Sequence, residues 1–227
     1  MYQEILEQLG DGIRLVAVSK TKPVQDIQAL YDLGQRDFGE NYVQELVDKH
    51  TQLPPDIRWH FIGHLQSNKV KMIAPFVHLI HGVDSLKLLK EIDKQAARCD
   101  RVIPCLLQVH IAREETKFGL DAGELEEVLA DGVGIAKGAH GPGDLQTASG
   151  GLRNVSVMGL MGMASFTDDV NKVREEFRGL KALFDTWFRM PGGVLSMGMS
   201  GDYKIAIEEG SNMVRIGSLL FGERNYM

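Results

Sequence analysis

The stretch Arg14-Leu-Val-Ala-Val-Ser-Lys20 decides the fold that we expect for this chain. Its apolar, partly β-branched residues favour a pleated, buried surface, so the stretch predicts a core strand rather than a helical turn. Thr21-Lys22-Pro23 then interrupts it. A strand buried on both faces is typical of a parallel sheet, and its last residue, Lys20, would lie at the rim where the sheet opens. By itself this position favours a solvated lysine that ends a strand; a functional lysine is the alternative.

The composition is that of a globular protein. The chain has 227 residues, of which 44% are hydrophobic and 25% are charged. This length suits one α/β barrel or one doubly wound domain, and the composition excludes a disordered or fibrous protein. The formal net charge of -6 offers no general attraction to a phosphate backbone, so we expect no nucleic-acid partner.

The sequence also bears on the cellular compartment. No run reaches the ~18 apolar residues that a membrane span requires, and residues 1–7 lack the apolar core of a secretory signal. Cys99 and Cys105 have no metal-ligand spacing and indicate reduced thiols. We therefore expect a soluble, cytoplasmic protein without a metal site.

Predicted strands and helices alternate along the chain. The strands are predicted at residues 14–20, 37–40, 58–63, 78–83, 103–111, 155–163, 194–199 and 213–216, and the helices at 24–33, 42–50, 67–73, 86–98, 123–129, 168–188 and 203–209. Eight such units favour parallel pairing in a closed (β/α)₈ TIM barrel, one domain over residues 1–227. An open doubly wound sheet is the alternative. Residues 131–154, which are rich in glycine, interrupt the alternation and predict a mobile loop.

Functional groups of a parallel barrel gather at the carboxyl ends of its strands. The residues predicted there are Lys20, Asn41, His64, Ser85, Lys117, Met163, Ser165, Ser200, Arg215, Gly217 and Ser218. The last two strands are each followed by a glycine turn with a serine, and barrels often bind phosphate at these two places. Each turn alone is more typical of a helix cap. Together, and with a lysine across the barrel mouth, they predict a phosphorylated carbonyl ligand, for which we expect pyridoxal phosphate.

Lys20 has the chemistry that such a ligand needs. An imine forms only from a neutral amine, and a free lysine, with a pKa near ~10.4, is mostly charged at neutral pH. Partial burial and a nearby Arg215 would both lower the pKa of Lys20. Lys20 would then be a better nucleophile in the barrel mouth than in water.

Six blocks of the sequence carry a resemblance to a known family. They are AVSKTKP (17–23), FGENYVQE (38–45), WHFIGHLQSNK (59–69), GLMGM (159–163), LSMGMS (195–200) and VRIGS (214–218). In this order they resemble the pyridoxal phosphate homeostasis protein family, which is similar to the barrel half of alanine racemase, its N-terminal domain, standing alone. The resemblance implies a monomeric barrel with Lys20, Asn41, Met163, Ser200, Arg215, Gly217 and Ser218 as its cofactor-binding residues.

The resemblance also implies a function. The protein would hold pyridoxal phosphate as an aldimine of Lys20, exchange it, and so serve intracellular cofactor homeostasis, with apoenzymes as candidate partners. Arg215 would face the ring nitrogen; because arginine only donates and stays charged, it disfavours ring protonation and carbanion chemistry. The alternatives are an amino-acid racemase, for which the chain has no residues left to build a second acid or base, and a barrel that binds another phosphorylated metabolite without a covalent link. We expect no catalytic residues.

Several assignments stay open on the sequence alone. Asn41 either lies beside the cofactor ring or caps the helix that follows it. His60 and His64 either border the site or lie in the core and at the rim. Lys117 is either a solvated loop charge or a second amine near the site. Residues 131–154 form a longer loop than the family predicts at that place.

Overall fold

The structure, a computed structural model, describes residues 1–112, 118–132, 152–188 and 192–222. Eight parallel strands close into a barrel in the order in which they occur along the sequence. They are β1 (Arg14–Val18), β2 (Asp37–Glu40), β3 (Arg58–Phe61), β4 (Leu79–Val83), β5 (Ile103–Gln108), β6 (Val155–Met161), β7 (Val194–Met199) and β8 (Met213–Ile216). The predicted (β/α)₈ barrel is confirmed, and the open sheet is wrong because β1 pairs with β8.

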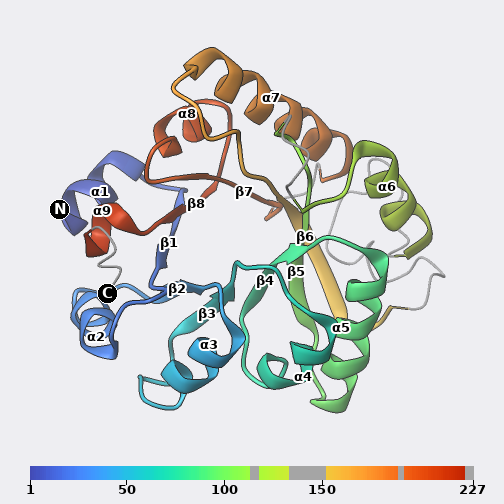
Figure 1. The fold of residues 1–227 in the computed structure, drawn as a ribbon, viewed down its shortest axis with the longest axis horizontal. Coiled ribbons are helices and arrows are strands. Elements are labelled where there is room, and N and C mark those ends of the chain that lie inside the picture. Colours follow the sequence, from blue (N-terminus) through green and yellow to red (C-terminus); the bar gives the residue numbers. More distant parts are fainter. Residues whose placement is uncertain (113–117, 133–151, 189–191, 223–227) are drawn as a thin grey trace.

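Helices surround the barrel (Figure 1). They are α1 (Tyr2–Leu9), α2 (Val24–Asp32), α3 (Val43–His50), α4 (Val70–Ile73), α5 (Leu86–Arg98), α6 (Ala122–Glu127), α7 (Val170–Trp187), α8 (Tyr203–Glu208) and α9 (Ser218–Phe221). A short 3₁₀ turn, η1 (Ser67–Lys69), precedes α4, and a π-helical turn, η2 (Val128–Gly132), follows α6. Within the described residues, no helix is both long enough and apolar enough to cross a membrane.

The predicted and observed boundaries agree best where the sequence carries a clear stop. Strands β2, β7 and β8 have the predicted bounds, and Ser85, one of two predicted caps of α5, accepts a hydrogen bond from the Leu88 amide at 3.3 Å. Strand β5 ends at Gln108, three residues before its predicted end. Beyond that end, the Val109 amide still donates to the Met161 carbonyl of β6 at 2.8 Å, and Val109 also forms an isolated bridge with Leu120.

The core has two layers. A large layer between strands and helices includes Phe38, Phe61 and Phe177, all fully buried. A small apolar cluster of Val16, Leu79, Leu106, Met161 and Met213 lies inside the barrel. Polar side chains occupy much of the remaining interior, and these place the functional groups described below.

Two predictions lie outside the described residues. Lys117 is one of them, and most of the predicted glycine-rich loop of residues 131–154 is the other. Both stay predictions.

Candidate functional site

A cavity of about 410 Å³ opens at the carboxyl ends of the strands. This volume lies in the range of small-molecule sites. Its lining includes every residue predicted for cofactor binding, namely Lys20, Asn41, Met163, Ser200, Arg215, Gly217 and Ser218. The structure thus brings these residues together, and their roles toward a cofactor stay a prediction.

The loop that carries Lys20 is anchored to α3. Lys20 lies two residues beyond β1, and the next residue, Thr21, turns the backbone with a φ of 64°. The Thr21 amide donates to Glu45 Oε1 at 2.6 Å, and Lys49 Nζ donates to the Ser19 carbonyl at 2.7 Å and to Glu45 Oε1 at 2.7 Å. These bonds fix the backbone on both sides of Lys20.

Glu40, the last residue of β2, completes this anchor. Its Oε1 accepts from Ser19 Oγ at 2.6 Å and from Lys49 Nζ at 2.8 Å, whereas its buried Oε2 has no partner among the described residues. Burial raises the pKa of Glu40 to about 7, because desolvation outweighs the contacts with Lys49 and Ser19. Glu40 is not among the residues predicted from the sequence; a glutamate at the end of a strand buried on both faces was the available signal.

Asn41 directly follows β2 and lines the cavity. The N-cap of α3 is Tyr42, so the interpretation of Asn41 as the helix cap is wrong. Asn41 Oδ1 is buried and has no hydrogen-bond partner within the described structure. Gly63 packs against it so closely that a Cβ there would lie 2.3 Å from the Asn41 carbonyl oxygen. The backbone is therefore held tightly, while the side chain keeps an unsatisfied acceptor at a cavity.

The loops after β7 and β8 meet at one side of the cavity. Ser200 follows β7, Gly217 and Ser218 follow β8, and the Gly217 amide donates to Ser200 Oγ at 3.2 Å. The N-cap of α8 is Asp202, so Ser200 does not cap that helix. Hydroxyl and amide donors from two loops thus lie together where a barrel commonly binds phosphate.

Arg215 supplies a buried cation to the same cavity. It is only 4% exposed, and its guanidinium donates to the Ser196 carbonyl (2.9 Å), Ser196 Oγ (2.5 Å) and the Gly162 carbonyl (3.0 Å). Burial lowers the pKa of Arg215 to about 10, so the group stays charged at neutral pH. A fixed positive donor therefore lies at the wall of the cavity.

Three other residues considered from the sequence, His60, His64 and Ser165, have structural partners among the described residues. His60 is fully buried inside the barrel, and His64 is at the rim, where its Nδ1 lies 3.0 Å from Asp84 Oδ2 and its ring stacks on Phe118. Ser165 Oγ donates to Glu176 Oε1 at 2.7 Å. Among the described residues, none of these three side chains lines the cavity.

Comparisons with known proteins agree with this geometry. Residues 2–225 match the family model "Alanine racemase, N-terminal domain". The chain is 39% identical to a pyridoxal phosphate homeostasis protein of Aquifex aeolicus, over 99% of this chain and 94% of that protein. It is 36% identical to the human protein of the same name, over 94% of this chain and 77% of that protein.

Solved structures show the same relationship. PipY of Synechococcus elongatus, solved with PLP bound, superposes with a TM-score of 0.81 at 32% identity and covers 97% of this chain and 98% of its own. An alanine racemase of Clostridium difficile has a TM-score of 0.74 at 13% identity, over 98% of this chain and 56% of that one, and shows the fold alone. The predicted resemblance is confirmed: the chain belongs to the pyridoxal phosphate homeostasis protein family and has the barrel fold of the alanine racemase N-terminal domain.

Proposed function

We propose that this protein binds pyridoxal phosphate in the cavity at the carboxyl ends of its strands and serves cofactor homeostasis by holding and releasing it. One observation carries the proposal: a single cavity collects a lysine, the serine and glycine loops after β7 and β8, and the buried cation of Arg215. Membership of the family and the similarity to PipY, which was solved with PLP bound, support it.

The residues present fit this cofactor. Pyridoxal phosphate supplies an aldehyde carbon that an amine can attack, a phosphate and a ring nitrogen. Lys20 Nζ would be the amine that holds this aldehyde. Ser200, Gly217 and Ser218 would hold the phosphate, and Asn41, with its unsatisfied buried acceptor, would lie beside the ring.

The proposed role of Arg215 favours a carrier over a racemase. A charged guanidinium donates hydrogen bonds and accepts none, so opposite the ring nitrogen it holds that nitrogen unprotonated. The electron-withdrawing power on which amino-acid chemistry depends is then weak. Met163 and Val18 add apolar lining to the same cavity.

We further propose that apoenzymes receive the cofactor and that the protein acts as a monomer in the cytoplasm. Both cysteines are free thiols, which supports a reducing compartment. Transfer would be measured by activation of a cofactor-free pyridoxal enzyme in the presence of the loaded protein, and the oligomeric state by sedimentation. Activation no faster than with the same concentration of free cofactor, or a dimer in solution, would contradict these two proposals.

Two lysines of the cavity allow a matched test. Lys20 is the proposed anchor, whereas Lys22 lines the same cavity but donates to the Phe221 carbonyl at 2.8 Å. After mixing with pyridoxal phosphate and gel filtration, we expect the unsubstituted protein and Lys22→Ala to retain cofactor absorbance and Lys20→Ala to lose it. Retention by Lys20→Ala, with loss in Lys22→Ala, would contradict the assignment.

The racemase alternative has its own test. The loaded protein is incubated with L-alanine and with D-alanine, and optical rotation is followed. We expect no change beyond that caused by free pyridoxal phosphate. Racemisation that disappears in Lys20→Ala would show an enzyme instead of a carrier.

A further inference from the structure

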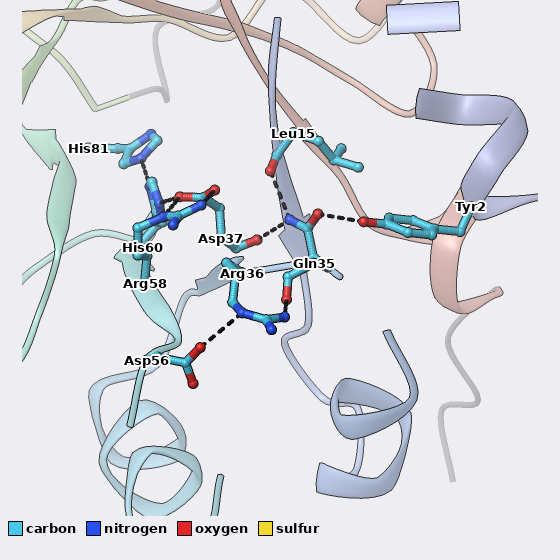
Figure 2. Close-up of polar contacts among 9 residues, drawn as sticks. All are labelled: Tyr2, Leu15, Gln35, Arg36, Asp37, Asp56, Arg58, His60 and His81. Atoms are coloured by element: carbon cyan, nitrogen blue, oxygen red, sulfur yellow. Dashed lines mark hydrogen bonds and ion pairs between the residues drawn. The ribbon is translucent and has the colours of Figure 1, made fainter. Parts of the chain in front are cut away.

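A column of buried polar side chains runs through the barrel interior to Arg215. Its buried members are Asp37, His60, His81, Ser196 and Arg215. Arg58, whose side chain is 46% exposed, lies at its outer end, and we call these six residues the polar column. Arg58 Nη2 lies 2.5 Å from Asp37 Oδ2, Asp37 Oδ1 lies 2.9 Å from His60 Nε2, and His60 Nδ1 lies 2.9 Å from His81 Nε2. His81 Nδ1 then lies 3.2 Å from Ser196 Oγ, which accepts from Arg215 at 2.5 Å. Figure 2 shows its first four members.

The two ends of the polar column fix the direction of every hydrogen bond in it. Arg215 can only donate, so Ser196 Oγ accepts and must donate its own proton elsewhere. At the other end burial pushes the pKa of Asp37 upward, but the bonds from Arg58 and His60 outweigh it and hold the carboxyl ionised. Asp37 therefore only accepts, and the proton between it and His60 is on His60 Nε2.

The histidines between these ends have one consistent arrangement. Burial lowers the pKa of His60, and burial together with His60 and Arg215 lowers that of His81 well below its ordinary value, so both rings are neutral. Arg14 also lowers the pKa of both rings, Arg58 lowers that of His60, and His78 lowers that of His81. A neutral His60 with its proton on Nε2 accepts at Nδ1, so His81 Nε2 donates to it. His81 Nδ1 is then bare and accepts from Ser196.

From this we propose that His81 is a positioning residue for the ligand cavity, acting through Ser196 to fix the guanidinium of Arg215, with Asp37 setting the tautomer of both histidines. The inference rests on the proposed function, because Arg215 is the residue proposed for the ring nitrogen. Ser196 Oγ and the two backbone carbonyls hold three of the five N–H groups of Arg215. The guanidinium plane is thereby set before any ligand arrives.

The alternative interpretation of two residues of the polar column, Asp37 and His60, is a metal site that they would form with His78. Ligand atoms of Asp37, His60 and His78 lie within 4.8 Å of one another. However, both oxygens of Asp37 accept from Arg58, at 2.9 and 2.5 Å. A dication would have to displace this guanidinium, so the geometry favours the hydrogen-bonded column.

The first experiment needs neither a variant nor a cofactor. The ring ¹⁵N shifts of the full chain, labelled at histidine, report the tautomer of each ring. We expect His60 and His81 to be neutral with the proton on Nε2 between about pH 7 and 8, because burial lowers the pKa of both rings below the ordinary value for histidine. A proton on Nδ1 of either ring, or an imidazolium in this range, would overturn the proposed direction of the polar column.

The second experiment links the polar column to the cavity. Ser196→Ala should weaken pyridoxal phosphate binding about tenfold, since a hydrogen bond to a charged group is lost. Ser211→Ala is the matched control: Ser211 is equally buried and donates to the Met197 carbonyl at 2.8 Å, away from Arg215. It should lower the unfolding midpoint similarly and leave binding within about twofold.

Double substitution separates positioning from packing. His81→Phe should weaken binding about as much as Ser196→Ala, and the double variant should be no weaker than either, because both changes break the same path. Additive losses, or equal losses in Ser211→Ala, would overturn the positioning role. Absence of binding by the unsubstituted protein would instead overturn the proposed function, whereas the tautomers would still decide the direction of the polar column.

Discussion

Two side-chain amides, one at each end of the barrel, differ in how their hydrogen bonds are satisfied. At the amino-terminal end Gln35 is fully used: its Oε1 accepts from the Tyr2 hydroxyl at 3.1 Å, and its Nε2 donates to the carbonyls of Leu15 and Asp37 (Figure 2). At the carboxyl end Asn41 keeps a buried Oδ1 without a described partner. A satisfied group stabilises the fold, whereas an unsatisfied one costs free energy and is typical of a binding site. The difference predicts which substitutions affect stability and which affect binding.

The largest effect is expected at the carboxyl end. Ser200→Asp would place a negative charge beside the bound phosphate, and at about 4 Å this repulsion corresponds to roughly a thousandfold loss of affinity. The unfolding free energy should change little. Ser85→Asp is the control, because Ser85 caps α5 at the same end of the barrel and aspartate is an equally good cap. Titration with pyridoxal phosphate measures the affinity of both variants. A similar loss of affinity in Ser200→Asp and Ser85→Asp would contradict the assignment of Ser200 to the phosphate.

At the amino-terminal end we expect a loss of stability instead. Arg58→Met removes the partner of Asp37, whose side chain is only 7% exposed, and should lower the unfolding free energy by about 3 kcal/mol. Affinity for pyridoxal phosphate should also fall, but by less than in Ser196→Ala, because Arg58 acts on Arg215 only through Asp37 and the two histidines, and the bond between Asp37 and His60 remains. Lys181→Met, which breaks an exposed helical pair with Asp185, should cost only about 0.5 kcal/mol. Urea unfolding of the unsubstituted protein, Arg58→Met and Lys181→Met measures these free energies. Equal losses in the two variants would show that Asp37 does not need the guanidinium of Arg58.

Glu40, near the loop of Lys20, predicts a pH dependence. Its pKa rises from 4.5 to about 7 on folding, so between these values the folded protein holds a proton that the unfolded chain has lost. The contribution of Glu40 to the free energy of unfolding therefore falls as the pH rises from 4.5 to about 7. The fall amounts to about 2 kcal/mol between pH 5 and 8. Glu40→Gln should remove this fall. An unchanged pH dependence in the variant would place its origin elsewhere.

The smallest effects compare two asparagines. Asn41→Ala should raise the unfolding free energy by about 1 kcal/mol, because an unsatisfied polar atom is removed, and should weaken pyridoxal phosphate binding about fivefold. Asn212, before β8, is satisfied on both sides: its Oδ1 accepts from the Leu195 amide and its Nδ2 donates to the Gly193 carbonyl. Asn212→Ala should therefore lower stability by about 1 kcal/mol and spare binding. If both variants lost stability, Asn41 would be an ordinary structural residue.

The sequence was sufficient for the parts of the molecule that depend on local pattern. Alternating strands and helices predict the closed barrel, and Lys20, Ser200 and Gly217 could be placed in one mouth because each follows a strand. Helix α9 was missed, because four residues carry no helical period.

The polar column could not be predicted, because it depends on how residues of five strands meet. The pairing shifts between Ser196 and Met199 along β7 and between Ile80 and Val83 along β4. His81 on β4 and Ser196 on β7 belong to strands that are not paired with each other, and they are 115 residues apart in the sequence. A strand's own residues do not reveal such a shift, so His60 could be predicted only as a core or site-edge residue.

The most direct test of the proposed function is chemical trapping at the carboxyl end. Borohydride makes the bond between a lysine and pyridoxal phosphate irreversible, and peptide mapping then identifies the modified residue. We predict the label on Lys20, with Lys22 of the same cavity unmodified. A label on any other lysine, or none after incubation with excess pyridoxal phosphate, would contradict the claim that this cavity holds the cofactor through Lys20.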